Sequence, residues 1–286
     1  MSKVTGKVCV VTGAGSGIGR ELALELGRRG ARAIAISDVQ DQNLAETARL
    51  LGEQAPGVTI HQQHLDVADR ETFMSYADAV AGEFGVVHQL YNNAGIASGK
   101  TIRDADFAIY DRVIGVNLFG VIHGTKVFLP HLIASGDGHV TNISSLNGYM
   151  AQDELSAYCT TKFGVRGFTE TLRIEMLRDK LPVRVTVVHP GGVKTNIANN
   201  GLLHAEELGY QVSDHERRRV QAYNEKLLRL PAAVAAKIIV DGVENNRPRV
   251  LVGNDAKIVD LLVRMFPAGY PRLTLALNRL AKAAVK

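Results

Sequence analysis

The most constraining feature of the sequence is a glycine-rich turn between a short apolar run and a helical pattern near the start of the chain. Residues 8–11 are all apolar, as expected of a parallel strand buried on both faces. Gly13, Gly17 and Gly19 follow, and residues 20–26 then show helical periodicity. Glycines let the backbone approach a phosphate, while free N–H groups and the helix dipole face the anion. The sequence therefore predicts a strand–turn–helix unit that binds a dinucleotide.

The glycine spacing departs from the commonest dinucleotide-binding fingerprint. Counted from Gly13, the pattern Gly-x-Gly-x-x-Gly requires glycine where the chain has Ile18, and the spacing present is Gly-x-x-x-Gly-x-Gly. A glycine turn alone can be a structural loop. Its place between a strand and a helix is what favours phosphate binding here.

Strand-like and helix-like segments alternate through most of the chain. We expect strands at 31–37, 58–65, 88–91, 139–143, 183–188 and 249–252, and helices at 43–51, 69–84, 106–128, 158–177 and 231–243. This alternation predicts an α/β fold, a single Rossmann-type doubly wound parallel sheet of about seven strands with helices on both faces. No Pro/Ser-rich linker divides the chain, so we expect one catalytic domain over residues 1–253.

Two further segments carry separate expectations. Residues 196–230 are polar and charged, and we expect them to form a lid over the substrate. Residues 254–286 carry apolar side chains at helical spacing among basic ones, which predicts a C-terminal amphipathic helical extension. In the favoured interpretation it packs over the pocket or a neighbouring subunit, and contact with a membrane surface is the alternative.

The end of the second predicted strand bears on the choice of dinucleotide. Asp38 follows Gly19 by 19 residues, where an acidic side chain binds ribose hydroxyls and repels a 2′-phosphate. No Arg or Lys follows it directly, and none stands inside the glycine turn. These observations favour NAD over NADP. The alternative is that Asp38 only caps the next helix.

A second candidate site lies between Ser145 and Lys162. Tyr158 and Lys162 are four residues apart in a helical pattern, so both side chains project from one face. A phenol has an ordinary pKa of about 10, and a neighbouring ammonium favours the phenolate, which suits acid/base work near neutral pH. Ser145 precedes them in a glycine-containing loop, where a hydroxyl could bond a substrate oxygen as charge builds on it. The adjacent Ser144 competes for that place, and an isolated Tyr-x-x-x-Lys is most often an ordinary surface pair.

Other polar residues follow or interrupt the predicted elements. Asp66 stands at a strand end, where a carboxylate could accept a hydrogen bond from an adenine amino group. The tetrapeptide 92–95, Asn-Asn-Ala-Gly, ends the next strand at the edge where open α/β sheets bind ligands, although Asn side chains also fix turns. Asn117 lies among apolar residues and needs hydrogen-bond partners, for which the backbone is the structural alternative.

Together these motifs closely resemble the short-chain dehydrogenase/reductase family. The resemblance rests on Thr12-Gly13-x-x-x-Gly17-x-Gly19, Asn92 to Gly95, Asn117, Ser145, Tyr158, Lys162 and Pro190-Gly191. It covers residues 5 to about 197, with a last helix and strand between 232 and 252.

The resemblance implies four catalytic residues and a set of cofactor contacts. Tyr158 would be the acid/base, and Lys162 would lower its pKa while bonding the nicotinamide ribose. Ser145, preferred to Ser144 by its spacing from Tyr158, would polarise the substrate oxygen, and Asn117 would hold a water that links Lys162 to a proton relay. The implied cofactor contacts are Gly13, Ser16, Gly17, Ile18, Gly19, Asp38, Asp66, Val67, Asn93, Ala94, Gly95, Tyr158, Lys162, Pro190, Gly191, Val193 and Thr195.

The implied activity is hydride transfer between NAD(P), with NAD favoured, and a secondary alcohol or ketone. A mainly apolar lining favours a hydrophobic substrate: Ile96, Leu146, Asn147, Met150, Ala151 and Leu155. Two alternatives stay open because fold does not establish function, a non-catalytic dinucleotide-binding regulator and an isomerase or dehydratase on the same scaffold. The resemblance also implies a homodimer or homotetramer, joined through the helices around Asn117 and Tyr158.

Composition narrows the class and the compartment. The 33 basic and 29 acidic residues give a net charge of +4 that is not concentrated in one block, so we expect no nucleic-acid partner. Cys9 and Cys159 are the only cysteines, and neither a disulfide framework nor metal-ligand spacing is present. We see no apolar signal segment and no uncharged apolar run of membrane-spanning length. We therefore expect a cytoplasmic protein without a bound metal.

Overall fold

The chain is built around one parallel β-sheet. The computed structural model describes residues 2–207, 209–272 and 274–275. Seven strands lie in the order β3-β2-β1-β4-β5-β6-β9, and every neighbouring pair is parallel. Their bounds are β1 Val8–Thr12, β2 Ala33–Asp38, β3 Thr59–His64, β4 Gln89–Asn92, β5 Gly138–Ile143, β6 Val183–Pro190 and β9 Arg249–Val252. This confirms the predicted doubly wound sheet.

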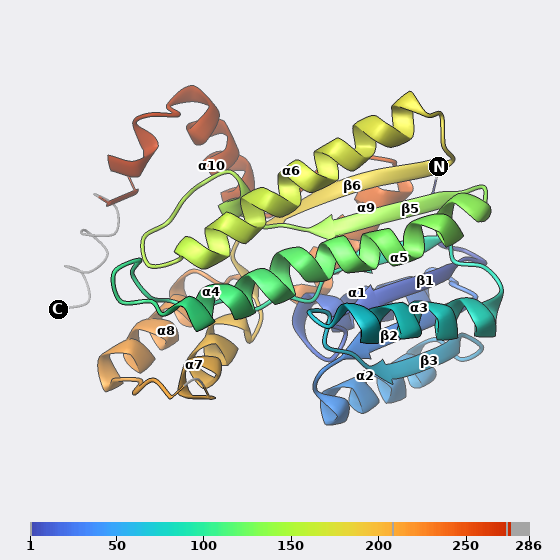
Figure 1. Ribbon diagram of the computed structural model, residues 1–286, viewed down its shortest axis with the longest axis horizontal. Coiled ribbons are helices and arrows are strands. Elements are labelled where there is room, and N and C mark those ends of the chain that lie inside the picture. The colour runs from blue at the N-terminus through green and yellow to red at the C-terminus, as the bar shows by residue number, and fades with distance from the viewer. Residues whose placement is uncertain (1, 208, 273, 276–286) are drawn as a thin grey trace.

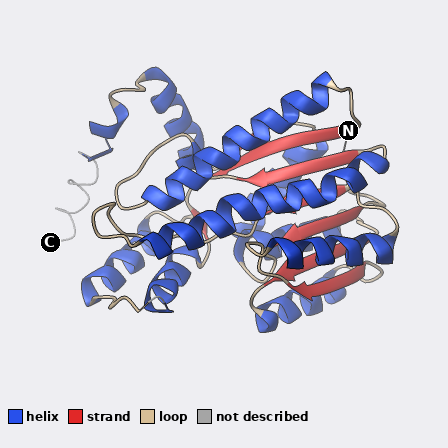
Figure 2. Cartoon of the chain, viewed as in Figure 1, coloured by secondary structure: helices blue, strands red, loops and turns tan. Residues whose placement is uncertain are grey.

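Helices cover both faces of the sheet (Figures 1 and 2). One layer contains α1 Gly17–Arg28, α2 Asp41–Gln54 and α9 Ala232–Glu244, and the other contains α3 Arg70–Phe84, α4 Phe107–Ile114, α5 Gly120–Ala134 and α6 Ser156–Arg178. Each face has its own apolar core. Leu22, Leu26 and Val240 belong to the first, and Phe73 and Phe128 belong to the second. Because β1 is buried throughout, its first four residues form a continuous apolar run. β5 is also buried throughout but carries polar side chains, and those of His139 and Asn142 are hydrogen-bonded inside the fold.

The helix predicted at 106–128 is longer and less regular than expected. It runs from Phe107 to Ala134, and a π-helical turn at Gly115–Phe119 joins α4 to α5. The Gly120 N–H bonds the Gly115 carbonyl, five residues back. By length and composition this is the one helix of the described chain that could cross a membrane. It packs into the second core through Val116, Phe128 and Leu132, as a core helix does.

The amino edge of the sheet is closed by a buried hydrogen-bonded network. Ser2 is almost fully buried, and its hydroxyl donates to Asn246 Oδ1 and lies 2.9 Å from His139 Nδ1. The other ring nitrogen of His139 lies 2.8 Å from Thr186 Oγ1. These contacts tie the start of the chain to β5 and β6, far from the carboxyl edge.

Additional elements gather at the carboxyl edge. Helices α7 Ile197–Glu207 and α8 Asp214–Lys226 occupy the predicted lid segment, and a small parallel pair, β7 Val193–Lys194 with β8 Leu230–Pro231, brackets it. The sequence did not predict this pair. Helix α10, Asn254–Met265, begins the predicted extension. The later positions of that amphipathic pattern, 273 and 276–286, lie outside the described residues.

Candidate active site

A large cavity opens where the strands end. Its volume is about 1430 Å³, and it is lined by residues from the carboxyl ends of β1, β2, β4, β5 and β6, from α6 and from the lid segment. All but two of the predicted site residues line it: Gly13, Ser16, Gly17, Ile18, Asp38, Asp66, Val67, Asn93, Ala94, Gly95, Ser145, Tyr158, Lys162, Pro190, Gly191, Val193 and Thr195. Gly19 and Asn117 lie behind its wall. The fold thus gathers residues from seven separate motifs at one edge, as open α/β sheets do.

The glycine turn is too tightly packed for side chains. A Cβ at Gly13, whose φ is +65°, would lie 2.6 Å from Ala94 Cα. A Cβ at Gly19 would lie 2.0 Å from the Gly13 carbonyl oxygen. The N-cap residue of α1, Ser16, makes no side-chain cap and lines the cavity, so the helix N-terminus faces it uncovered. This arrangement of close backbone and helix dipole fits a pyrophosphate.

Asp38 is fixed at the end of β2 by the glycine turn. Its carboxylate accepts hydrogen bonds from the Gly15 N–H at 2.8 Å and the Gln40 N–H at 3.0 Å. The N-cap of α2 is Gln40, so the alternative that Asp38 caps that helix is wrong. The basic residue nearest the turn in sequence is Arg20, whose guanidinium bonds the Gly15 carbonyl at 2.5 Å and Thr47 Oγ1 at 2.9 Å and does not line the cavity.

Two predicted contacts have partners that sequence reasoning missed. Asp66 pairs with Arg112 from α4 at 2.6 Å, and its second oxygen accepts from the Ala68 N–H. Asn93 Nδ2 donates to the carbonyls of Thr12 and Gly13, at 3.0 and 3.1 Å. The side chain of Asn93 therefore fixes the glycine turn to β4, as the structural alternative proposed. Arg112 is 46 residues from Asp66, and no local pattern indicates the pairing.

Tyr158 and Lys162 lie together on the first turns of α6. The Lys162 ammonium is 5.5 Å from the centre of the Tyr158 ring and donates to the Ile143 carbonyl at 3.0 Å. Lys162 is almost fully buried, and burial lowers its pKa to about 8, so the side chain is charged at pH 7. A Cβ at Gly95 would lie 3.5 Å from Lys162 Nζ, so this glycine leaves room for the ammonium.

The two adjacent serines have different environments. The Ser144 hydroxyl donates to the Lys162 carbonyl at 2.8 Å, so it fastens β5 to α6. Ser145 adopts an extended backbone ahead of the short 3₁₀ turn Leu146–Gly148, and its hydroxyl accepts from the Asn147 N–H at 3.1 Å. The Ser145 hydroxyl keeps its own proton to donate. This difference singles out Ser145, as the spacing to Tyr158 did.

Asn117 lies inside the π-helical turn and is fully buried. Its amide accepts from the Ile96 N–H and donates to the Ile96 carbonyl, both at 2.8 Å, and it also approaches Thr161 Oγ1 at 3.3 Å. Its side chain therefore holds the loop after Gly95 against α6. The backbone bond foreseen as the structural alternative is present, and the water-mediated relay stays a prediction.

The end of the cavity that lies against residues 196–230, the segment predicted to be a lid, is mainly apolar. Of the residues predicted to line it, Ile96, Leu146, Asn147 and Leu155 do so, whereas Met150 and Ala151 do not. The Ala151 N–H instead donates to the Tyr270 hydroxyl at 3.2 Å, because this part of the loop turns toward the C-terminal segment. Residues 196–230 add further apolar side chains to the lining: Leu202, Leu203, Val212, Val220, Leu227 and Leu228.

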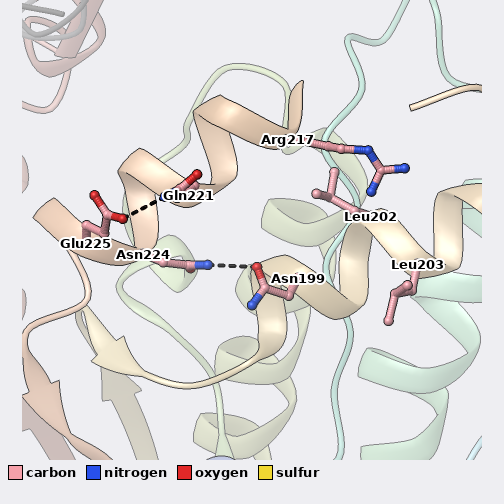
Figure 3. Close-up of a pocket in the computed structure, with 7 residues that line it drawn as sticks. All are labelled: Asn199, Leu202, Leu203, Arg217, Gln221, Asn224 and Glu225. Atoms are coloured by element: carbon pink, nitrogen blue, oxygen red, sulfur yellow. Dashed lines mark hydrogen bonds between the residues drawn. The ribbon is translucent and has the colours of Figure 1, made fainter. Parts of the chain in front are cut away.

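The segment 196–230 contacts the loop after β4. Lys100 pairs with Glu216 of α8 at 3.1 Å and lies 5.2 Å from the centre of the Tyr210 ring. The Tyr210 hydroxyl bonds Asp106. A second cavity of about 440 Å³ lies between α7 and α8, where Asn224 donates to Asn199 at 2.8 Å (Figure 3). It holds amides, leucines, one arginine and one glutamate, and none of the predicted catalytic residues lines it.

The fold and the site define a class. The class is that of nucleotide-binding oxidoreductases with a Rossmann fold. Its features here are a doubly wound sheet, a glycine turn after the first strand, and a buried Lys beside a Tyr at the carboxyl edge. The chain belongs to the short-chain dehydrogenase family, because the family model for short chain dehydrogenases matches residues 7–204.

Individual relatives cover most of the chain. SadH of Mycobacterium tuberculosis, which is named as an oxidoreductase, is 49% identical over 276 residues, 96% of each protein. Epidermal retinol dehydrogenase 2 of Mus musculus is 37% identical over 195 residues, 68% of this chain and 62% of that protein. A short-chain dehydrogenase/reductase from Burkholderia phymatum, solved in complex with NAD, has a TM-score of 0.85 at 27% identity and covers 96% of this chain and 97% of its own.

Proposed function

We propose that the protein transfers a hydride between NAD and a secondary alcohol or ketone with apolar substituents, with Tyr158 as the acid/base. The observation that carries this proposal is the buried Lys162 ammonium beside the Tyr158 ring, in one cavity with Ser145 and the glycine turn. Family membership supports an oxidoreductase, and the pair supplies the proton handling that alcohol oxidation requires.

Each protein group has one role in alcohol oxidation. The Ser145 hydroxyl donates to the substrate oxygen and orients it, and Tyr158, as phenolate, takes the hydroxyl proton. The Lys162 ammonium stabilises that phenolate. When bound, oxidised NAD would supply the acceptor for the hydride of the carbinol carbon. The proton goes to Tyr158, so the loss of hydride and proton together turns the alcohol into the carbonyl product. Reduction follows the same steps in reverse.

The cofactor would be held from three sides. The glycine turn and the N-terminus of α1 would bind the pyrophosphate, and Asp38 the adenosine ribose. The remaining contacts would be Asp66 and Val67 at the adenine, Asn93 at the nearby ribose, Lys162 at the nicotinamide ribose, and Val193 and Thr195 at the carboxamide. NAD is favoured because Val39 and Gln40, the cavity residues next to Asp38, carry no positive charge.

The apolar lining supports a hydrophobic substrate. Ile96, Leu146 and Leu155 face the same cavity as Tyr158, and the lid contributes leucines and valines opposite them. A relative named as a retinol dehydrogenase is consistent with an apolar alcohol. We propose that residues 196–230 act as the lid and residues 254–286 as a separate extension. A homodimer or homotetramer and a cytoplasmic location complete the proposal, the latter because Cys9 and Cys159 are both unpaired and buried.

The test begins with cofactor binding and proceeds to turnover. Purified protein is titrated with NADH and with NADPH by nicotinamide fluorescence, and then NAD and a panel of menthol, borneol and cyclohexanol are supplied while NADH formation is followed. We expect tighter NADH binding and turnover of at least one alcohol. Binding without turnover on a broad alcohol and ketone panel would favour the dinucleotide-binding regulator, and binding of neither cofactor would contradict the enzyme.

A further inference from the structure

His189 is a buried histidine behind the candidate site, and one of its ring nitrogens makes a hydrogen bond. His189, near the end of β6, is fully buried, and its Nδ1 lies 2.8 Å from the Ser145 carbonyl oxygen. Because a carbonyl only accepts, Nδ1 carries the proton. The same oxygen accepts from the Gly148 N–H at 2.9 Å. Two donors therefore fix the peptide that follows Ser145.

The other ring nitrogen of His189 makes no hydrogen bond to the described residues. Nε2 is buried and finds no hydrogen-bond partner among the described residues. A buried polar atom without a partner is unfavourable, and an apolar side chain would avoid it. Burial lowers the pKa of His189 to about 4, so at pH 7 the ring is neutral and Nδ1 keeps its proton. Histidine is therefore explained at this position by the bond from Nδ1.

The ring is held in place from the C-terminal side. The ring centres of Tyr149 and His189 are 5.1 Å apart at an interplanar angle of 63°, an edge-to-face contact. The Tyr149 hydroxyl donates to the Ala256 carbonyl in the first turn of α10 at 2.6 Å. The Arg249 guanidinium lies 5.2 Å from the Tyr149 ring centre and makes two bonds to Asp260 of α10.

We propose that His189 is a positioning residue of the active site. Its Nδ1–H fixes the Ser145 carbonyl and with it the direction of the Ser145 hydroxyl, while Tyr149 fixes the His189 ring against α10. The proposal rests on the proposed function, in which Ser145 orients the substrate oxygen. An extended serine with a freely rotating following peptide would present its hydroxyl in several directions, and small misplacements of a reacting group are costly for the rate.

The experiment compares three replacements of His189. Asn carries an amide N–H at nearly the same distance from Cα as His Nδ1, Gln carries it one methylene too far, and Leu carries none. With NAD and the fastest alcohol of the panel above, we expect His189→Leu and His189→Gln to lower kcat by about tenfold or more, and His189→Asn to recover most of it. The Kd for NADH should stay unchanged in all three.

The matched control is the other fully buried histidine of the sheet. His139 lies at the amino edge and bonds Ser2 and Thr186. We expect His139→Leu to lower the melting temperature and leave kcat of the folded protein unchanged. If folded His189→Gln or His189→Leu keeps the wild-type kcat, or His189→Asn is no better than His189→Gln, the positioning role is wrong while the proposed function stands. A wild-type protein that turns over no alcohol or ketone overturns both.

Discussion

At the scale of single residues, the adjacent Ser144 and Ser145 have different hydrogen-bonding roles, although the sequence alone hardly distinguishes them. The Ser144 hydroxyl donates a hydrogen bond to the Lys162 carbonyl, whereas the Ser145 hydroxyl only accepts one, from the Asn147 N–H. Alternation along an extended segment sends the two side chains to opposite sides.

Replacement of Tyr158 by Phe tests the acid/base directly. The change removes the hydroxyl that we propose exchanges the substrate proton and leaves the ring beside Lys162, so kcat should fall by about a hundredfold or more, with the Kd for NADH nearly unchanged. Steady-state rates and fluorescence titration measure the two. Tyr110→Phe is the control, because it removes a hydroxyl that bonds Ser156 outside the cavity and should keep most of the turnover. Undiminished activity in Tyr158→Phe would refute the assignment.

Replacement of Asp38 by Asn tests the cofactor preference. Asn still offers an oxygen to the Gly15 N–H but no longer repels a 2′-phosphate, so the ratio of the Kd for NADPH to that for NADH should fall about tenfold. Asp41→Asn alters an exposed carboxylate that pairs with His64 and should leave the ratio as it is. An unchanged ratio in Asp38→Asn would mean that Asp38 does not face the ribose.

At the scale of elements, sequence patterns predicted the helices, strands and turns that are determined by neighbouring residues. The strand–turn–helix unit around Gly13 and the alternation of strands and helices follow from periodicity and glycine placement, and the structure confirms them. The π-helical turn at Gly115–Phe119 was missed, because it is stabilised by Asn117 bonding Ile96, 21 residues away. The β7–β8 pair joins segments that are distant in sequence and only two residues long, so no periodicity marks it.

The glycine turn makes an element-scale prediction. In Gly19→Ala the new Cβ would lie 2.0 Å from the Gly13 carbonyl oxygen and 2.5 Å from Asn93 Nδ2, so the turn must move. We expect a loss of about 2 kcal/mol or more in the free energy of unfolding and a large loss of NADH affinity. Urea unfolding and fluorescence titration measure these.

A second glycine supplies the control for that substitution. Gly82 lies within α3, and a Cβ there meets nothing within 4 Å. Gly82→Ala should stabilise the protein by up to about 1 kcal/mol and leave NADH binding alone, because alanine only adds helix propensity. If both variants behaved alike, the packing argument for the turn would fail.

At the scale of the whole molecule, two buried histidines predict how stability depends on pH. Burial lowers the pKa of His139 to about 3 and that of His189 to about 4, whereas both titrate near 6.5 when unfolded. Below pH 6.5 the unfolded chain therefore binds protons that the folded protein does not. Stability is fully present above that pH and falls toward pH 4, each histidine contributing up to about 1.4 kcal/mol per pH unit.

Chemical unfolding between pH 7 and pH 5 measures that slope. Most carboxylates are still ionised there in both states, so the histidines dominate. His139→Asn should give a shallower slope than the wild-type protein, and a replacement of the exposed His64 should not. A slope that does not change in His139→Asn would show that His139 binds protons equally in the folded and unfolded states, against the lowered pKa.

The residues that gather at the cavity could be predicted from the sequence, whereas the contacts that hold them in place could not. Each motif carries its chemistry in a few neighbouring residues, and parallel strands bring their carboxyl ends to one edge whatever the loop sequences are. The supports are pairs formed across the fold. His189 is 44 residues from Ser145 in the sequence, and Arg112 is 46 residues from Asp66. No local sequence pattern indicates either pairing.

The two edges of the sheet have different roles: one is closed by structural contacts and the other carries the cavity. The network of Ser2, His139 and Thr186 closes the amino edge, while the loops and helices that line the cavity all leave from the carboxyl edge. Changes in the segments 146–155 and 196–230 can therefore alter the shape of the cavity without touching the network that closes the amino edge. The part of the molecule that would set substrate choice can vary while the sheet stays as it is.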